Sequence, residues 1–291
     1  MKKILIVGEH GFVATSFGYY MKKFNSYELT FISSRNDAWK QHDFHGYNCV
    51  FNASGLAHAN AMDGSDEDYI EVNGKLPGQI ARKAKEEGVP LYISISSEII
   101  YGDTSELGES KVIKKDTVPT PDGIYGKSKI MGEKEVLQYA DDTFQTAILR
   151  PPMIYSEDAV ENFARLCSFA VKSPIFPKLK NEQSMIYIDN LCELIRLIID
   201  NNEGGIYFPQ EREYMQTSKL VKDISKAAGN NVRETKVFNG ALKLLSHRFR
   251  FIRKAFGNLV YDKSLSGHFG WKYCVVDYEE SIRRIAEQYK K

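Results

Sequence analysis

The sequence predicts an α/β protein with a doubly wound parallel sheet and a smaller C-terminal α+β lobe. The chain opens on a short continuous apolar run, "KILIVG", which is typical of a strand buried on both faces. A turn that carries glycine follows this run directly, and a helical pattern follows the turn. Strand-like and helix-like segments then alternate as far as residue 150, which favours right-handed βαβ units.

The elements of the first half follow from hydrophobic periodicity. The apolar runs of strand length that we expect to form the parallel sheet are residues 3–8, 27–34, 47–54, 89–96 and 144–150. The segments with helical spacing are residues 11–24, residues 66–88 and the run "GIYGKSKIMGE" at 123–133. We expect the helix at 66–88 to restart near Pro77 and to end at Gly88.

The pattern loosens after "RPP" at 150–152. The elements expected there are a helix at 159–172, a proline-bounded loop at 173–180, a strand at 184–189, a helix at 190–201, a strand at 204–210 and a helix at 217–229 capped by Thr217. We place the first domain at residues 1–155 and the second lobe at 156–291, and we expect segments of the two to interleave.

Composition is that of an ordinary globular protein. The chain has 291 residues, 43% of them hydrophobic and 26% charged, with a net charge of +1. This balance gives no reason to expect a nucleic acid partner. The basic run "HRFRFIRK" at 247–254 is short, and we interpret it as a helix with a solvated face or a local anion site.

Cysteine usage and the N-terminus bear on the compartment. The four cysteines lie far apart and form no C-x-x-C pair, so we expect no metal site, no disulfide framework and a reducing, cytoplasmic location. The first apolar run is too short for a signal-peptide core or a membrane span. We therefore expect no membrane partner.

The glycine turn after the first strand suits a pyrophosphate. Gly8, Gly11 and Ala14 form G-x-x-G-x-x-A, in which small residues allow close backbone approach and the next helix offers its N-terminus to an anion. No Gly-Lys-Ser/Thr follows, so a triphosphate P-loop is not expected. The turn opens a βαβ chain, so it predicts a Rossmann-type dinucleotide-binding domain rather than a turn without a ligand.

The end of the second strand bears on the cofactor. NAD sites favour an acidic residue there, whereas NADP sites accept an arginine nearby. The segment reads Ser33, Ser34, Arg35 and has no carboxylate. It favours NADP over NAD, with Arg35 and the serines around a 2′-phosphate; the alternative is a solvated loop arginine.

Tyr125 and Lys129 lie four residues apart in the run at 123–133, so a helix places them on one face. An ammonium beside a phenol favours the phenolate and lowers the pKa of the tyrosine toward neutral pH. Such a group suits general acid–base catalysis. The alternative is a surface helix in which the tyrosine packs over the lysine stem.

These motifs together resemble the extended short-chain dehydrogenase/reductase family over nearly the whole chain. The stretches that carry the resemblance are the glycine turn, "VFNASGLAH", "SISSEIIYG", "GIYGKSKIMGE", "AILRPPMIY" and "SMIYIDNL". The resemblance is strongest to bacterial nucleotide-sugar epimerases and 4-ketoreductases of surface-polysaccharide pathways.

The resemblance implies a set of site residues. It assigns catalysis to Ser97, Tyr125 and Lys129, with hydride moving between a sugar carbon, C4, and the nicotinamide. The residues it assigns to the cofactor are Gly8, Gly11, Phe12, Ala14, Ser33, Ser34, Arg35, Ser54, Gly55, Asn73, Tyr125 and Lys129. The candidate substrate contacts are Ser97, Glu98, Met153, Asn162 and Phe176, with Tyr187 as a further candidate. Met153 and Tyr187 are equally consistent with core positions. It also implies a UDP-sugar substrate and a homodimer.

Some residues depart from the family pattern. Glu98 is followed by Ile99 rather than by a second acid, which disfavours 4,6-dehydration. Gln183 stands where an arginine usually contacts the diphosphate, and Arg150, Lys178 or Lys180 are candidates to replace it. Ser156 stands where glycine is usual.

Two readings of the chemistry stay open. The overall resemblance favours an epimerase, which regenerates its cofactor, whereas Arg35 favours a ketoreductase that consumes NADPH. A separate alternative is a non-catalytic NAD(P)-binding sensor on the same fold, although relatives of that kind typically lack the tyrosine–lysine pair.

Overall fold

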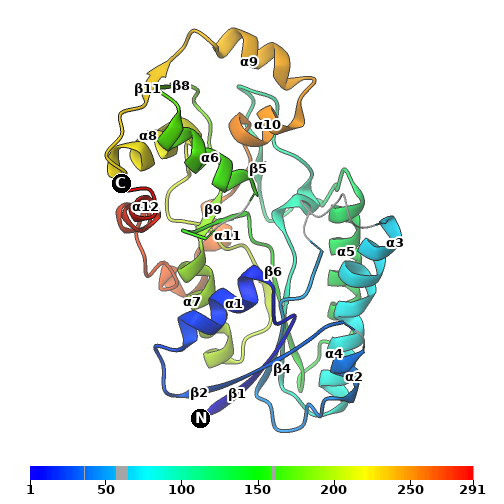
Figure 1. Ribbon diagram of the computed structural model, residues 1–291. Coiled ribbons are helices and arrows are strands. Elements are labelled where there is room, and N and C mark those ends of the chain that lie inside the picture. The colour runs from blue at the N-terminus through cyan, green and yellow to red at the C-terminus, as the bar shows by residue number, and fades with distance from the viewer. Residues whose placement is uncertain (36, 57–64, 159–160, 291) are drawn as a thin grey trace. The chain divides into compact units, whose positions relative to one another are not determined.

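The structure is a computed structural model and describes residues 1–35, 37–56, 65–158 and 161–290 (Figure 1). The chain forms two compact units that alternate along the sequence. The first unit comprises Met1–Gly102, Val118–Pro151 and Ile188–Pro209, and the second comprises Asp103–Thr117, Pro152–Tyr187 and Gln210–Lys291.

A six-stranded parallel sheet is the centre of the first unit. Its strands, from one edge to the other, are β10 (Gly205–Tyr207), β6 (Gln145–Leu149), β4 (Leu91–Ile95), β3 (Cys49–Asn52), β1 (Lys2–Val7) and β2 (Tyr27–Ile32). Every neighbouring pair is parallel. The strand order reverses at β1, which lies between β2 and β3, and ligands of such sheets bind outside the carboxyl ends of the strands at this switch point.

Helices cover both faces of the sheet, which confirms the predicted doubly wound fold. The helices of the first unit are α1 (Phe12–Met21), α2 (Ala38–Gln41), α3 (Asp66–Tyr69), the π-helix η2 (Ile70–Lys75), α4 (Leu76–Glu86), the 3₁₀-helix η3 (Glu98–Tyr101), α5 (Ile124–Leu137) and α7 (Ile188–Asn201). Figure 1 shows α1 and α7 together on one side of the strands, and α4 and α5 together on the other.

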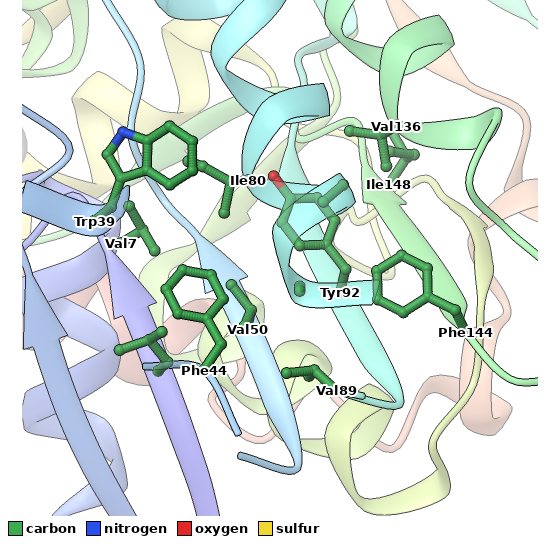
Figure 2. Close-up of a cluster of buried hydrophobic side chains, with 13 residues drawn as sticks. Val7, Trp39, Phe44, Val50, Ile80, Val89, Tyr92, Val136, Phe144 and Ile148 are labelled. Carbon is green, nitrogen blue, oxygen red and sulfur yellow. The ribbon is translucent and has the colours of Figure 1, made fainter. Parts of the chain in front are cut away.

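A cluster of buried side chains joins α4 and α5 to the sheet (Figure 2). Val50 and Tyr92 project from the strands toward Ile80 of α4 and Val136 of α5, and all four are fully buried. Trp39 of α2 closes the same cluster and is 3% exposed. Burial of large apolar side chains contributes about 1.5–3 kcal/mol each, so this packing holds α5 firmly against the sheet.

The segment 66–88 is predicted as one helix that restarts near Pro77, and the structure resolves how it does so. The wide π-helical turn η2 separates α3 from α4, and Pro77 lies in the first turn of α4, where a missing N–H is tolerated. Gly88 follows α4 with a φ of +75°, a conformation that favours glycine and ends the helix there. A π-helical turn inside a helix often marks a functional position.

The second unit contains short strands paired in three parallel ribbons. Its strands are β5 (Val112–Ile113), β7 (Met153–Tyr155), β8 (Ile175–Pro177), β9 (Met185–Tyr187), β11 (Arg233–Thr235) and β12 (Val260–Tyr261), paired as β5 with β12, β7 with β9 and β8 with β11. Its helices are α6 (Glu161–Lys172), α8 (Thr217–Ala227), α9 (Asn239–Ser246), α10 (Arg250–Phe256), α11 (Lys263–Ser266), the 3₁₀-helix η4 (His268–Trp271) and α12 (Tyr278–Glu287).

The structure corrects details of the second half. Residues 173–180, predicted as a loop from their prolines, contain β8, because Pro177 ends a strand in a two-stranded ribbon where a missing N–H is tolerated. Thr217 does not cap α8: the N-cap is Gln216, and the Thr217 hydroxyl donates to the carbonyl of Ala255 at 2.5 Å. Within the described part of the chain, every helix is too short or too polar to span a bilayer.

Candidate active site

The register of the sheet gathers the carboxyl ends of four strands at one edge. Val7 of β1 pairs with Asn52 of β3, which pairs with Ser94 of β4, and Ile95 of β4 pairs with Leu149 of β6. The residues that follow these strand ends, including the glycine turn and Ser97, therefore lie along the same edge. The sequence assigned most of the site to these loops.

The glycine turn after β1 has the geometry of a pyrophosphate loop. Gly8 has a φ of +99°, and a Cβ there would lie 2.7 Å from the backbone nitrogen of Ser54. Gly11 is the N-cap of α1, whose first turn has no acidic residue and no side-chain cap. Ala14 is buried and Phe12 is half-buried. The amide groups at the start of α1 therefore suit an anion, and the turn fits a dinucleotide pyrophosphate.

The loop after β2 places Ser33, Ser34 and Arg35 at the same edge. The Ser33 hydroxyl accepts a hydrogen bond from the Arg35 amide at 3.2 Å, and the Arg35 side chain is exposed. This geometry leaves the guanidinium able to reach a phosphate.

Asn73 joins the loop after β3 to the π-helix η2, which packs against α5. Its side-chain oxygen accepts from the Leu56 amide at 2.9 Å, and its side-chain nitrogen donates to the Leu56 carbonyl at 3.0 Å. A Cβ on Gly55 would lie 3.0 Å from Nζ of Lys129 and 3.1 Å from Oδ1 of Asn73. A side chain at position 55 would therefore fill the space in front of the lysine.

Lys129 is buried, with 8% of its surface exposed, and its ammonium donates to the Ile95 carbonyl at 3.0 Å. Burial lowers the pKa of Lys129 to about 8, and the nearby Glu133 carboxylate opposes this shift. The ammonium lies 5.9 Å from the ring centroid of Tyr125, as the spacing on α5 predicts. The rings of Tyr69 and Tyr125 pack edge to face at 6.1 Å between centroids.

Ser97 is the N-cap of η3 and lies two residues after the end of β4. Its hydroxyl accepts a hydrogen bond from the Ile99 amide at 3.3 Å, which still leaves its own proton to donate. Glu98 is buried beside it, and its amide donates to the Pro151 carbonyl at 2.9 Å. Ser54 is buried and its hydroxyl donates to Oδ1 of Asn52 at 2.5 Å.

A buried ion pair behind the site is absent from the sequence prediction. Arg150 donates to both carboxylate oxygens of Glu133, at 3.0 and 2.6 Å, and to the Tyr101 hydroxyl at 2.6 Å. The Ser96 hydroxyl donates to the same carboxylate. The pair connects α5 to the segment 96–101 that carries Ser97. Since this network holds its guanidinium, the structure argues against Arg150 as a replacement diphosphate contact.

The other candidate substrate residues lie in the second unit. Met153 is half-buried in β7, and the Tyr187 hydroxyl donates to Glu157 at 2.6 Å. Phe176 is 4% exposed and packs between Phe169 and Phe256, at 5.9 and 5.6 Å between ring centroids, which is a core position in this unit. The side chain of Asn162 lies outside the described part of the structure. Their contact with a substrate stays a prediction.

Gln183 and the lysines beside it also have partners in the second unit. The Gln183 side chain is buried and donates to the carbonyls of Lys254 and Gly257 at 2.8 and 3.1 Å. Lys178 pairs with Glu234 at 3.5 Å. Lys180 is exposed.

Comparison with known families identifies the fold and its lineage. Residues 4–208 match the model of the NAD dependent epimerase/dehydratase family. The chain belongs to that family. The match covers the glycine turn, Ser97, Tyr125 and Lys129, and it confirms the resemblance seen in the sequence.

Individual relatives are similar to this chain at low identity. A UDP-glucose 4-epimerase from Vibrio cholerae is 28% identical over 181 residues, which are 59% of this chain and 55% of that protein. The chain spans about half the length of the curated relatives it matches.

Solved structures share the fold over the whole chain. The crystal structure of UDP-glucuronic acid 4-epimerase from Bacillus cereus with NAD has a TM-score of 0.74 and 17% identity, and covers 99% of this chain and 96% of that one. A dTDP-4-dehydrorhamnose reductase from Bacillus anthracis with NADP has a TM-score of 0.69 and 15% identity, with complete coverage of both chains.

Proposed function

We propose that this protein is an enzyme that binds a nicotinamide dinucleotide and transfers hydride at C4 of a nucleotide-activated sugar. The observation that carries the proposal is a buried ammonium, Lys129, beside the phenol of Tyr125 on α5. Burial of a charge is unfavourable for stability, and within the described residues this ammonium has a single carbonyl as its hydrogen-bond partner. Strongly perturbed groups cluster at functional sites.

The residues at the sheet edge fit the cofactor. Gly8 and Gly11 would hold the pyrophosphate against the N-terminus of α1, and the space in front of Gly55 would admit the nicotinamide ribose beside Lys129. The bound nicotinamide accepts or returns hydride. The family match and the solved relatives with NAD and NADP support a nicotinamide cofactor.

Tyr125 acts as the acid–base in this proposal. It takes the proton from the sugar hydroxyl as the alcohol becomes a ketone, and it returns a proton in the reverse direction. Lys129 is charged below a pH of about 8 and favours the phenolate through its positive charge. Ser97 donates its remaining proton to the reacting oxygen, and its cap to η3 fixes its position.

Arg35 supports NADP over NAD, since an exposed guanidinium follows β2 where NAD enzymes favour a carboxylate. NADPH suits net reduction of a 4-keto sugar, whereas the similarity to UDP-glucose 4-epimerase supports epimerisation with a retained cofactor. The same similarity supports a UDP-sugar as substrate. Precursor synthesis for a surface polysaccharide and a homodimer remain predictions.

A substrate panel tests the proposal. Purified protein is incubated with UDP-, GDP- and dTDP-sugars and their 4-keto forms, with and without NADPH, and the products are identified by mass spectrometry and NMR. Interconversion at C4 without NADPH indicates an epimerase, and NADPH-dependent reduction indicates a ketoreductase. Tight NAD(P) binding with no turnover in any arm would support the alternative, a non-catalytic sensor.

A further inference from the structure

The segment that links β11 to α11 has an unusual charge distribution. Residues 235–261 contain no aspartate or glutamate, and their basic residues are Lys236, Lys243, Arg248, Arg250, Arg253 and Lys254. These six contribute +6 to a chain whose net charge is +1, so the rest of the chain carries −5. We call residues 236–254 the basic segment. It extends beyond the run "HRFRFIRK", whose sequence suggests a helix with a solvated face or a local anion site.

The basic segment also exposes a concentration of large apolar side chains. Its exposed members are Val237 (83%), Phe238 (41%), Leu244 (75%), Leu245 (41%), Phe249 (41%) and Phe251 (60%). Across the described residues only 15 large apolar side chains are exposed, so six of them fall within 15 positions. Single exposed apolar residues are normal, but this concentration along one short segment is unusual, and larger exposed apolar patches mark interaction sites.

The helix α9 exposes leucine side chains on its outer side and on one flank. Ser246 is fully buried and Leu242 is half-buried four residues before it, so these two define the inner face. Leu244 lies on the opposite side and is 75% exposed, and Leu245 lies on a flank of the helix and is 41% exposed. Lys243 is exposed between the two faces. The outer side of α9 therefore carries a leucine where a surface helix usually carries only polar residues.

Specific contacts hold the basic segment in the second unit, so its exposure is not that of a loose terminus. Ile252 and Phe256 of α10 are 4% and 8% exposed. Glu106 pairs with Arg253 at 3.6 Å and with His247 at 3.3 Å. Figure 1 shows the segment as two helices, α9 and α10, between β11 and the C-terminal part of the chain.

Several of its basic groups remain available to an external anion. Lys236, Lys243 and Arg248 are exposed, and no ion pair to them is present among the residues that the structure describes. Phe249 and Phe251 lie on either side of Arg250 in the sequence, and their rings contact each other at 6.0 Å between centroids. Cations thus alternate with exposed aromatic and aliphatic groups.

This combination favours an anionic lipid surface over a nucleic acid. Phosphate backbones are bound by cations, and bases stack on aromatic rings, but neither uses exposed leucine and valine. The boundary between lipid headgroups and acyl chains accepts basic and apolar side chains together. Basic side chains contact the headgroups, and Leu and Phe enter the acyl region. An acidic protein partner would meet the same cations, but a groove takes anchors at i, i+3, i+4 and i+7 of one helix, whereas here the exposed apolar side chains are spread from residue 237 to residue 251 over α9, α10 and the turns beside them.

We propose that the basic segment is a peripheral docking site for an anionic phospholipid bilayer, with Val237, Leu244, Leu245 and Phe251 inserted at the headgroup boundary and Lys236, Lys243 and Arg248 on the lipid phosphates. This departs from the expectation, made from the sequence, that the protein has no membrane partner. It concerns binding to a membrane surface and not a span. It does not depend on the proposed reaction.

Vesicle flotation with the full-length protein tests the proposal. Vesicles of phosphatidylglycerol and phosphatidylcholine in equal parts are compared with pure phosphatidylcholine, at low and at high salt. We expect flotation with the anionic vesicles only, weakened by salt because the cations are exposed. Each basic side chain removed should weaken binding about fivefold, so Lys243→Gln with Arg248→Gln should weaken it about twenty-five-fold.

Matched variants separate the apolar contribution from charge. Leu244→Ser with Leu245→Ser should abolish flotation although the charge is unchanged. The control Val118→Ser with Val275→Ser removes two side chains of similar exposure, 73% and 51%, and should float like the wild type. The charge control is Lys134→Gln with Lys226→Gln, which removes two exposed lysines elsewhere.

Three results would overturn the proposal. The first is no flotation of the wild type with anionic vesicles at low salt. The second is flotation of the leucine variant at the wild-type level, together with heparin binding that the charge variant loses to the same degree as it loses flotation. This pair of results would indicate a polyanion site. The third is a wild-type protein that binds no vesicles and sediments as a dimer, which Leu244→Ser with Leu245→Ser converts to a monomer. This result would indicate an interface between copies of the chain.

Discussion

Replacement of the buried lysine should stabilise the protein while it removes activity. Among the residues that the structure describes, Lys129 has one hydrogen bond, to the Ile95 carbonyl, and its surface is 8% exposed. Its pKa falls from 10.5 to about 8 because burial penalises the charged form. At about 1.4 kcal/mol per pKa unit, the charge costs the folded state about 3 kcal/mol at pH 7.

We therefore expect Lys129→Met to raise the free energy of unfolding at pH 7. Loss of the hydrogen bond to Ile95 offsets about 1 kcal/mol of the gain, which leaves about 2 kcal/mol. Glu133 is not orphaned by the change, because Arg150 and Ser96 hold its carboxylate. Methionine fills nearly the same volume, so we expect no cavity.

The pH dependence provides the sharper measurement. Between a pH of about 8 and 10.5 the unfolded chain holds a proton on this lysine that the folded chain does not, so wild-type stability rises with pH in this window. Below a pH of about 8 the penalty is fully present. The advantage of Lys129→Met should therefore shrink by about 2 kcal/mol from pH 7 to pH 9.5.

Urea denaturation at the two pH values measures this directly, with Lys127→Met as a control on the exposed side of the same helix. The control should give the same difference from wild type at both pH values. A Lys129→Met protein that is less stable than wild type at pH 7, or whose advantage is the same at pH 9.5, would refute the claim that this lysine is a destabilising buried cation.

Three further predictions follow from the same geometry. Gly8→Ala should destabilise the fold by about 1–3 kcal/mol and weaken dinucleotide binding, because φ is +99° and the added Cβ would meet Ser54. Thermal melting measures the stability and a fluorescence titration measures the affinity. Unchanged affinity would argue against the turn as the pyrophosphate site. Arg35→Gln should weaken NADP binding about tenfold or more with little effect on NAD, by the same titration; equal loss for both would remove Arg35 from the 2′-phosphate. Arg150→Met should lower the free energy of unfolding, measured by urea denaturation, by about 3–5 kcal/mol because Glu133 is left buried and unpaired. Adding Glu133→Gln should recover part of this loss. Strictly additive losses would contradict the pairing.

The sequence predicted the parts of the site that depend on local spacing. Tyr125 and Lys129 share a helix face because they are four residues apart, and helical geometry alone brings them together. The glycine turn lies where the first apolar run ends, so the order of residue types along the chain predicted the strand, the turn and the helix. The parallel sheet followed from the alternation of strands and helices.

Features that depend on contacts between distant segments of the chain could not be predicted from the sequence. The pairing of Arg150 with Glu133 joins a strand end to a helix across 17 residues, and the strand register that brings them together is not encoded in either local pattern. The identity of β8 depended on a partner, β11, far along the chain, so its prolines suggested a loop. Prediction of the exposed leucines of α9 required knowledge of which side packs, since periodicity alone does not tell inside from outside.

Turnover by a Tyr125→Phe protein tests the central claim most directly. Phenylalanine keeps the ring that packs against Tyr69 and removes only the hydroxyl. NAD(P) affinity, measured by fluorescence titration, should stay within about twofold of wild type, while sugar conversion falls below detection. A purified Tyr125→Phe protein that still converts the substrate at a rate near wild type would contradict the assignment of this phenol as the acid–base.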